Sequence, residues 1–240
     1  MEKSLEDIIQ YIKWYGEVYG TNLYIEGEMS PVDLITAEVK RGDTASRKKV
    51  GQQKAVLDNL SPELKEFYDK IHTCQKCGLG KTRKNFVFGT GNPKADIMFV
   101  GEAPGKDEDE KGIPFVGRAG KLLDKMLAAI GLHRNDVFIA NVLKCRPPQN
   151  RDPLPDEIMH CEPYLKYQLE LIQPKVLVAL GRIAGQVLLK RNESLSVLRQ
   201  DTLLYEKTPL IVTYHPAALL RNPQWKQNAW TDLKKIKKVI

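Results

Sequence analysis

The feature that most constrains the fold is a set of four short apolar runs, each followed by a segment with helical periodicity. The runs cover residues 96–100, 137–143, 176–180 and 210–214. Runs of this length are typical of strands buried in a parallel sheet. Helices are expected at residues 121–130, 156–172, 182–189 and 227–238. Alternating strands and helices predict an α/β fold, a three-layer α/β/α sandwich with a central four-stranded parallel sheet.

The first 60 residues differ from the rest and are expected to form an extension. Apolar residues at helical spacing predict a short helix within residues 1–20. Residues 21–54 are polar and end in a basic run, which predicts a flexible basic linker. We therefore predict an N-terminal extension at 1–60 and one domain at 61–240.

The composition limits the compartment in which the protein is expected and the class of partner that it could bind. The start of the chain shows no secretory signal, and no apolar run reaches the roughly 18 residues that span a bilayer. We expect a cytoplasmic protein without membrane contact. The net charge of +7 favours a polyanionic partner, although a solvated basic surface would give the same value. Four cysteines in a cytoplasmic chain indicate metal or redox chemistry rather than disulfides.

Polar residues follow the predicted strands at the points where they end. Glu102 opens a glycine-rich acidic turn after the first strand, Asn141 ends the second, and His215 follows the fourth. Parallel strands end at one edge of a sheet, so these side chains are expected to share a crevice. A solvated acidic loop is the alternative for the turn, but Phe115 and Val116 close to its carboxylates favour a pocket.

The cysteines have the spacing of a shared ligand set. Cys74 and Cys77 form a C-x2-C pair, Cys145 follows the second strand, and Cys161 lies on the next predicted helix. Four thiolates suit either zinc or an iron-sulfur cluster, and the spacing does not choose between them. Four unrelated buried cysteines are the other possibility.

The stretch GEAPGKDEDEKGIPFVGRAG at residues 101–120 resembles the first motif of the family 4 uracil-DNA glycosylases, which carry an iron-sulfur cluster. Asn141 matches the asparagine that reads uracil in that family, residues 146–151 match its R-P-P-x-N-R loop, and residues 215–217 match its H-P-A motif. The resemblance extends over about residues 74–230. It implies a 4Fe-4S cluster on Cys74, Cys77, Cys145 and Cys161, and hydrolysis of the bond between uracil and deoxyribose in DNA.

The resemblance also implies roles for individual residues. The catalytic residues would be Glu102, Glu108 and His215, with the histidine donating to the leaving uracil and the carboxylates acting on the sugar cation and the water. Phe115 would stack on the base unless it is merely core, and Asn150 would hold Glu108. The residues that bind the substrate would be Gly101, Ala103, Pro104, Phe115, Asn141 and Asn150.

Contacts to DNA are expected around the crevice. Arg118, Arg151 and Arg221 would bind phosphates, and Leu219 with Leu220 would wedge into the duplex. The alternative for the two leucines is the first turn of a surface helix. Further basic residues that could line the crevice are Lys121, Arg146, Arg182 and Lys226. The expected partner is uracil-containing DNA, double- or single-stranded, bound by a monomer.

Two other functions fit parts of this pattern. A non-catalytic iron-sulfur module that binds nucleic acid would need the cysteines and the basic residues, but no carboxylate in the crevice. A glycosylase for another deaminated base, such as hypoxanthine, would need the same catalytic residues with a pocket of different shape.

Overall fold

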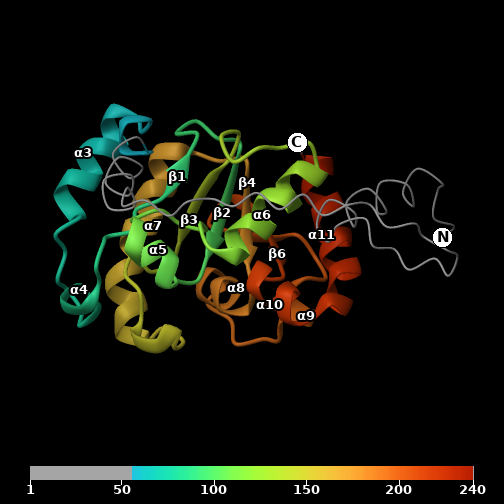
Figure 1. The fold of residues 1–240 in the computed structure, drawn as a ribbon. Helices are drawn as coiled ribbons and strands as arrows, with labels where there is room; N and C mark the ends of the chain where they lie inside the picture. Colours follow the sequence, from blue (N-terminus) through green and yellow to red (C-terminus); the bar gives the residue numbers. More distant parts are fainter. Residues whose placement is uncertain (1–55, 240) are drawn as a thin grey trace, which may run out of the picture.

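The structure, a computed structural model, describes residues 56–239 and centres on one six-stranded sheet of order β1-β3-β2-β4-β6-β5 (Figure 1). Strands β3, β2, β4 and β6 run parallel, and β1 and β5 pair antiparallel at the two edges. The strands are β1 (Thr90–Gly91), β2 (Ile97–Gly101), β3 (Phe138–Asn141), β4 (Val176–Leu180), β5 (Leu203–Tyr205) and β6 (Thr208–Thr213).

The prediction of an α/β sandwich is confirmed, but the sheet is mixed and six-stranded rather than four-stranded and parallel. The four predicted strands form its parallel centre. The two edge strands span only two and three residues, so they are too short to show an alternating pattern. β5 turns directly into β6 through Glu206, whose φ of 53° is in the left-handed region.

The four helices predicted between residues 121 and 238 are present, with boundaries shifted by a few residues. The helix predicted at residues 121–130 begins at Arg118, and the acidic turn contains the unpredicted helix α5. Short 3-10 helices cover Pro148–Asn150 and Pro223–Trp225. The α-helices are α3 (Pro62–Ile71), α4 (Leu79–Thr82), α5 (Lys106–Lys111), α6 (Arg118–Ala129), α7 (Pro155–Ile172), α8 (Arg182–Leu189), α9 (Leu195–Leu198), α10 (Pro216–Arg221) and α11 (Lys226–Val239).

The sheet separates two hydrophobic cores because side chains alternate along each strand. On β2, Met98 and Val100 pack with residues of α3, α7 and α8, whereas Ile97 and Phe99 pack with residues of α6 and α11 on the opposite face. Figure 1 shows the same division, with α3 and α7 on one side of the strands and α6 and α11 on the other. The molecule therefore has the three predicted layers.

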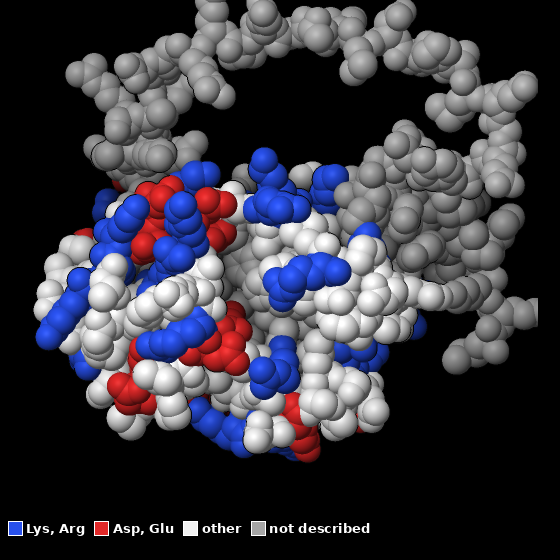
Figure 2. Space-filling view, turned by 60° about the horizontal axis from the view of Figure 1, so that its bottom comes forward, with Lys and Arg blue, Asp and Glu red and all other residues white. Residues whose placement is uncertain are grey.

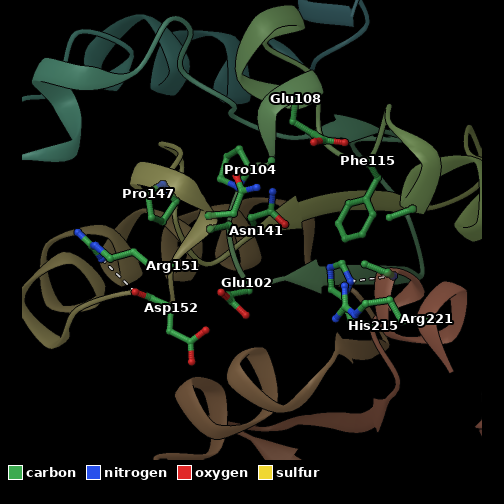
Figure 3. A pocket seen from close by; sticks show the side chains of 15 residues that line it. Glu102, Pro104, Glu108, Phe115, Asn141, Pro147, Arg151, Asp152, His215 and Arg221 are labelled. Atoms are coloured by element: carbon green, nitrogen blue, oxygen red, sulfur yellow. Dashed lines mark hydrogen bonds between the residues drawn. The ribbon is translucent and has the colours of Figure 1, made fainter.

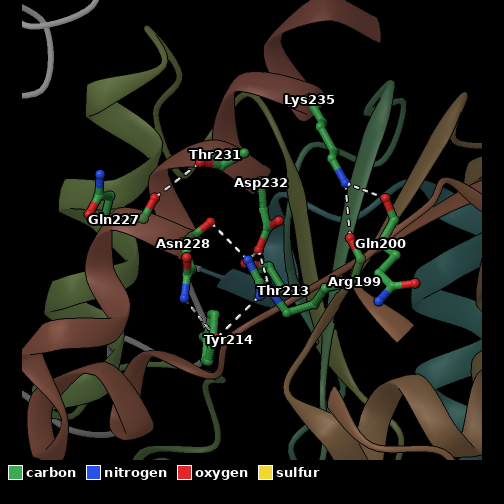
Figure 4. Close-up of polar contacts among 9 residues, drawn as sticks. All are labelled: Arg199, Gln200, Thr213, Tyr214, Gln227, Asn228, Thr231, Asp232 and Lys235. Carbon is green, nitrogen blue, oxygen red and sulfur yellow. Dashed lines mark hydrogen bonds and ion pairs between the residues drawn. The ribbon is translucent and has the colours of Figure 1, made fainter. Parts of the chain in front are cut away.

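A buried polar network fixes the end of β6 (Figure 4). Arg199 Nε donates to Asp232 Oδ2 at 2.7 Å, and Thr213 Oγ1 donates to the same oxygen at 2.8 Å. Arg199 Nη1 also donates to Tyr214 Oη at 3.2 Å. Because Thr213 and Tyr214 directly precede His215, this network ties the strand end that leads into His215 to α11.

Helix α3 is capped at its start by a side chain. Ser61 caps α3, with its hydroxyl accepting from the Leu64 N–H at 3.3 Å. The helix predicted within residues 1–20 and the linker predicted at 21–54 lie outside the described residues. Within the described part of the chain, no helix has the length and apolar character needed to cross a membrane.

Candidate active site

A pocket of about 390 Å³ opens at the carboxyl edge of the parallel strands. Glu102 follows β2, Asn141 ends β3 and His215 follows β6, and all three line it. Figure 3 shows their side chains around a common space. The shared crevice expected from the strand ends is therefore present. The other lining residues are Ala103, Pro104, Gly105, Glu108, Phe115, Ala119, Pro147, Asn150, Arg151, Asp152, Ala217 and Arg221.

His215 is held in one tautomer by the helix that it caps. Its Nδ1 accepts the backbone N–H of Ala217 at 3.1 Å. Burial, and secondarily the cation of Arg221, lower the pKa of His215 to about 4. The ring is therefore neutral near pH 7 and carries its proton on Nε2. That N–H is left to donate to a group in the pocket.

The pKa of Glu102 is shifted in the opposite direction from that of His215. Burial, reinforced by the nearby carboxylate of Asp152, raises the pKa of Glu102 to about 7, and Arg182 opposes the shift. Arg182 also pairs with Asp152, with Nη2 and Oδ2 3.5 Å apart. A carboxyl group with this pKa exchanges a proton near neutral pH, as a general base must. Sequence analysis missed Asp152, although it directly follows the loop at residues 146–151.

Asn141 presents an unused oxygen to the site. Its side chain is buried, and its Oδ1 has no hydrogen-bond partner among the described residues. A buried amide oxygen without a partner is costly, which indicates that a ligand completes it. Gly101 lies opposite and supplies the space, because a Cβ there would lie 2.4 Å from Oδ1 of Asn141 and 2.7 Å from Cζ of Phe115.

Phe115 forms one wall of the pocket in an unusual backbone conformation. Its φ is 52°, and its carbonyl accepts a hydrogen bond from Arg134 Nη2. The ring lies 5.5 Å from that of His215, tilted by 32°. Phe115 also packs with the core on the α6 side of the sheet, so it is at once a core residue and a lining residue of the pocket. A strained residue braced in a pocket is typical of a functional site.

Glu108 braces the loop that carries Phe115. Its Oε1 accepts from the backbone N–H groups of Val116 at 2.9 Å and Gly117 at 3.0 Å. The expected contact from Asn150 to Glu108 is replaced by another, since Asn150 Oδ1 accepts from Arg146 Nε at 2.7 Å. Asn150 therefore orders its own loop rather than the carboxylate.

Two of the three arginines expected to contact DNA line the pocket, and the third does not. Arg221 lines the pocket, as does Arg151, whose guanidinium is already engaged by Glu157 at 2.6 and 2.9 Å. Arg118 is exposed at the start of α6 and does not line the pocket. Figure 2 shows lysine and arginine side chains on several sides of a hollow, with carboxylates beside it.

The prediction that Leu219 wedges into DNA is wrong. Leu219 is fully buried and packs in the core beneath the sheet, whereas its neighbour Leu220 is 37% exposed. Both lie on α10, where successive residues point about 100° apart, so one faces the core and the next faces outward. Only Leu220 is left in a position to meet a duplex.

The cysteines come from distant segments and are linked by shared neighbours. Arg83 Nη1 donates to Sγ of Cys145 at 3.2 Å and to the carbonyl of Cys74 at 2.6 Å. Tyr164, on the same helix as Cys161, donates from its hydroxyl to Sγ of Cys74 at 3.2 Å. The C-x2-C pair is thus held beside the other two cysteines.

All four cysteines are free thiols. In residues 56–239, no three or more histidine, cysteine or acidic side chains form a group arranged to hold a single metal ion. Burial raises the pKa of the Cys145 thiol, and the Arg83 guanidinium opposes that shift.

Comparison with known proteins identifies relatives of this arrangement. Residues 88–234 match the family model of the uracil DNA glycosylase superfamily. A type-4 uracil-DNA glycosylase of Archaeoglobus fulgidus is 52% identical over 181 residues, which cover 72% of this chain and 91% of the relative. One from Saccharolobus solfataricus is 48% identical, covering 77% and 88%. A type-5 uracil-DNA glycosylase of Pyrobaculum aerophilum is 30% identical, covering 54% and 64%.

Proposed function

The chain belongs to the uracil DNA glycosylase superfamily, among the type-4 uracil-DNA glycosylases, and we propose that its pocket hydrolyses the N-glycosyl bond of a uracil flipped out of DNA. The observation that carries this proposal is the meeting of a carboxyl, an amide and an imidazole in one pocket, with the amide oxygen lacking a hydrogen-bond partner within residues 56–239. The product would be an abasic site, the first step of base excision repair.

Asn141 and Phe115 would recognise the base. An asparagine amide offers one acceptor and two donors, which match the N3–H and O4 of uracil and mismatch the amino group of cytosine. Stacking of a flipped base on an aromatic side chain contributes about 1–3 kcal/mol, which helps to offset the cost of unstacking it from the duplex. The position of Phe115 beside His215 supports this role. Gly101 and the backbone at Ala103 and Pro104 would close the pocket around the base.

His215 would stabilise the leaving uracil. As the bond breaks, negative charge gathers on the uracil O2, and the free Nε2–H of the neutral imidazole can donate to it. Removing one such donor costs about 2.7–4 kcal/mol in other enzymes. The Ala217 N–H bond to Nδ1 supports this assignment because it fixes the proton on Nε2.

Glu102 would act on the sugar side. An ionised carboxylate there stabilises the positive charge that develops on the deoxyribose and orients the attacking water as a base. Its raised pKa supports this role. Glu108 would contribute mainly by holding the Phe115 loop, through its two bonds to backbone N–H groups.

DNA would be held through its phosphates by Arg221 and Arg118, with Arg151 ordering the loop beside them and Leu220 filling the gap that the flipped nucleotide leaves. Such binding weakens as salt rises, because counterions are released from the phosphates. We propose that the enzyme acts as a monomer in the cytoplasm.

Cys74, Cys77, Cys145 and Cys161 would hold a 4Fe-4S cluster. Their donor set of four thiols, bridged by Arg83 and Tyr164, supports this assignment. When bound, the cluster would link the segment before α4 to the loop after β3 and to α7, which is a structural function. Cys145 lies four residues after Asn141, so the same loop would connect the cluster to the pocket.

A substrate panel tests the proposal. The protein is incubated with oligonucleotides containing U:G, U:A, T:G or hypoxanthine:T pairs, or a single uracil in single-stranded DNA, and abasic sites are cleaved with alkali. Cleavage of the uracil substrates with none at T:G is expected. Cleavage of the hypoxanthine substrate alone would favour a glycosylase for another deaminated base. DNA binding without any cleavage would favour a non-catalytic iron-sulfur module that binds nucleic acid.

A further inference from the structure

Lys144 is an unusually placed lysine. It lies in the loop after β3, and its side chain is fully buried. Its Nζ donates to the main-chain carbonyl of Asn141 at 2.8 Å and to Oε1 of Gln168 at 2.6 Å. A buried lysine is rare because desolvation of the ammonium is costly, and it persists only where its donors are satisfied.

The partners of Lys144 are themselves fixed. Gln168 is fully buried on α7, and its Nε2 donates to the carbonyl of Phe88 at 3.0 Å. The backbone N–H of Lys144 donates to Sγ of Cys161, also on α7, at 3.2 Å. Residues of α7 therefore accept hydrogen bonds from both the main chain and the side chain of Lys144.

Asn141 needs such an anchor because of its place at the end of a strand. Val142 N still bonds to the Gly101 carbonyl, so the ladder between β2 and β3 continues just past this residue. The Asn141 carbonyl is taken by Lys144 instead. No side chain or backbone group of the described residues donates to its Oδ1, so the main chain must hold the amide in place.

We propose that Lys144 is a positioning residue for base recognition, which fixes the main chain of Asn141 so that its amide faces the base. The inference rests on the proposed role of Asn141 in reading uracil. Lys144 does not line the pocket, so its effect on the base would pass through Asn141. The proposal also gives a reason for a charged side chain at a fully buried position.

A double-mutant cycle tests this. Single-turnover uracil release from a U:G duplex is measured for wild type, Lys144→Met, Asn141→Ala and the double variant. Lys144→Met is expected to slow release by about tenfold, since small misplacements of a recognition group cost up to about a hundredfold. In the Asn141→Ala background the same change is expected to slow release by less than about twofold, because the amide is already gone.

Two controls keep the result interpretable. Leu233→Ala removes packing from the core on the α11 side of the sheet, at a residue that does not line the pocket, and should lower the melting temperature without slowing release at a temperature where it is folded. If Lys144→Met does not fold, Lys144→Met/Gln168→Leu removes both polar partners together and takes its place in the cycle.

The outcomes distinguish the role of Lys144 from the role of Asn141. An equal slowing by Lys144→Met in both backgrounds would overturn the positioning role, since a merely structural residue acts independently of Asn141. Wild-type release by Asn141→Ala would instead overturn the proposed role of Asn141. Iron content and visible absorbance are measured for each variant, because a loss confined to the Lys144 variants would mean that the change acts through the cysteines.

Discussion

Gly101 and Asn141 lie side by side on neighbouring parallel strands, so close that a Cβ on the glycine would be 2.4 Å from Oδ1 of the asparagine. Real Cβ atoms do not approach a neighbour this closely. The end of β2 is therefore shaped by the need to leave the Asn141 amide and the Phe115 ring in place. This relationship connects the end of β2 to the amide that we propose reads the base.

Gly101→Ala is expected to lower uracil release by about a hundredfold or more, because the new methyl group must displace either the amide or the aromatic ring. Gly78→Ala serves as the control, since a Cβ there meets nothing within 4 Å. Single-turnover kinetics of both variants measure the effect. Equal rates for Gly101→Ala and wild type would mean that the amide is not needed where we place it.

The pH dependence should report the ionisation of Glu102. The base form is the carboxylate, so release should rise with pH through about 7 and then level off. Asp152→Asn removes a negative neighbour and should move the midpoint to lower pH. Arg182→Gln removes the opposing cation and should move it higher. Single-turnover pH profiles measure these midpoints, and unchanged midpoints in both variants would exclude Glu102 as the titrating group.

Leu219 and Leu220 form a matched pair on α10. Leu219→Ala empties a fully buried position and should cost about 2–5 kcal/mol of unfolding free energy. Leu220→Ala should leave stability nearly unchanged, but slow release from a duplex more than release from single-stranded DNA, which has no gap to fill. Denaturant unfolding and paired kinetic assays measure these effects. A single-stranded rate that falls as much as the duplex rate would contradict the wedge role.

Breaking the buried Arg199–Asp232 pair shown in Figure 4 should lower the free energy of unfolding more than breaking an exposed ion pair. Asp232→Ala leaves a largely buried guanidinium unpaired, which costs about 3–5 kcal/mol in comparable cases. Glu66→Gln breaks the exposed pair with Lys70 and should cost less than about 1 kcal/mol. Chemical denaturation compares the two. Similar losses would show that the buried network does not fix the end of β6.

The sequence predicted the parts of the molecule that follow repeating patterns. The four central strands are long enough to show as apolar runs, and parallel pairing alone places Glu102, Asn141 and His215 at one edge. β5 spans three residues and leaves no such pattern. Leu219 and Leu220 are chemically alike, and only the phase of α10 decides which one is buried. Asp152 was missed because its influence on Glu102 depends on how the loop folds back over the pocket.

The most direct test of the account compares uracil release with DNA binding for Glu102→Ala, Asn141→Ala and His215→Ala, each against wild type on the same U:G duplex. We predict that Glu102→Ala and His215→Ala each slow single-turnover release by about a hundredfold or more while changing DNA affinity by less than about threefold. Asn141→Ala should lose both release and discrimination against cytosine. Near-wild-type release by any of the three would contradict the claim that this pocket performs the reaction.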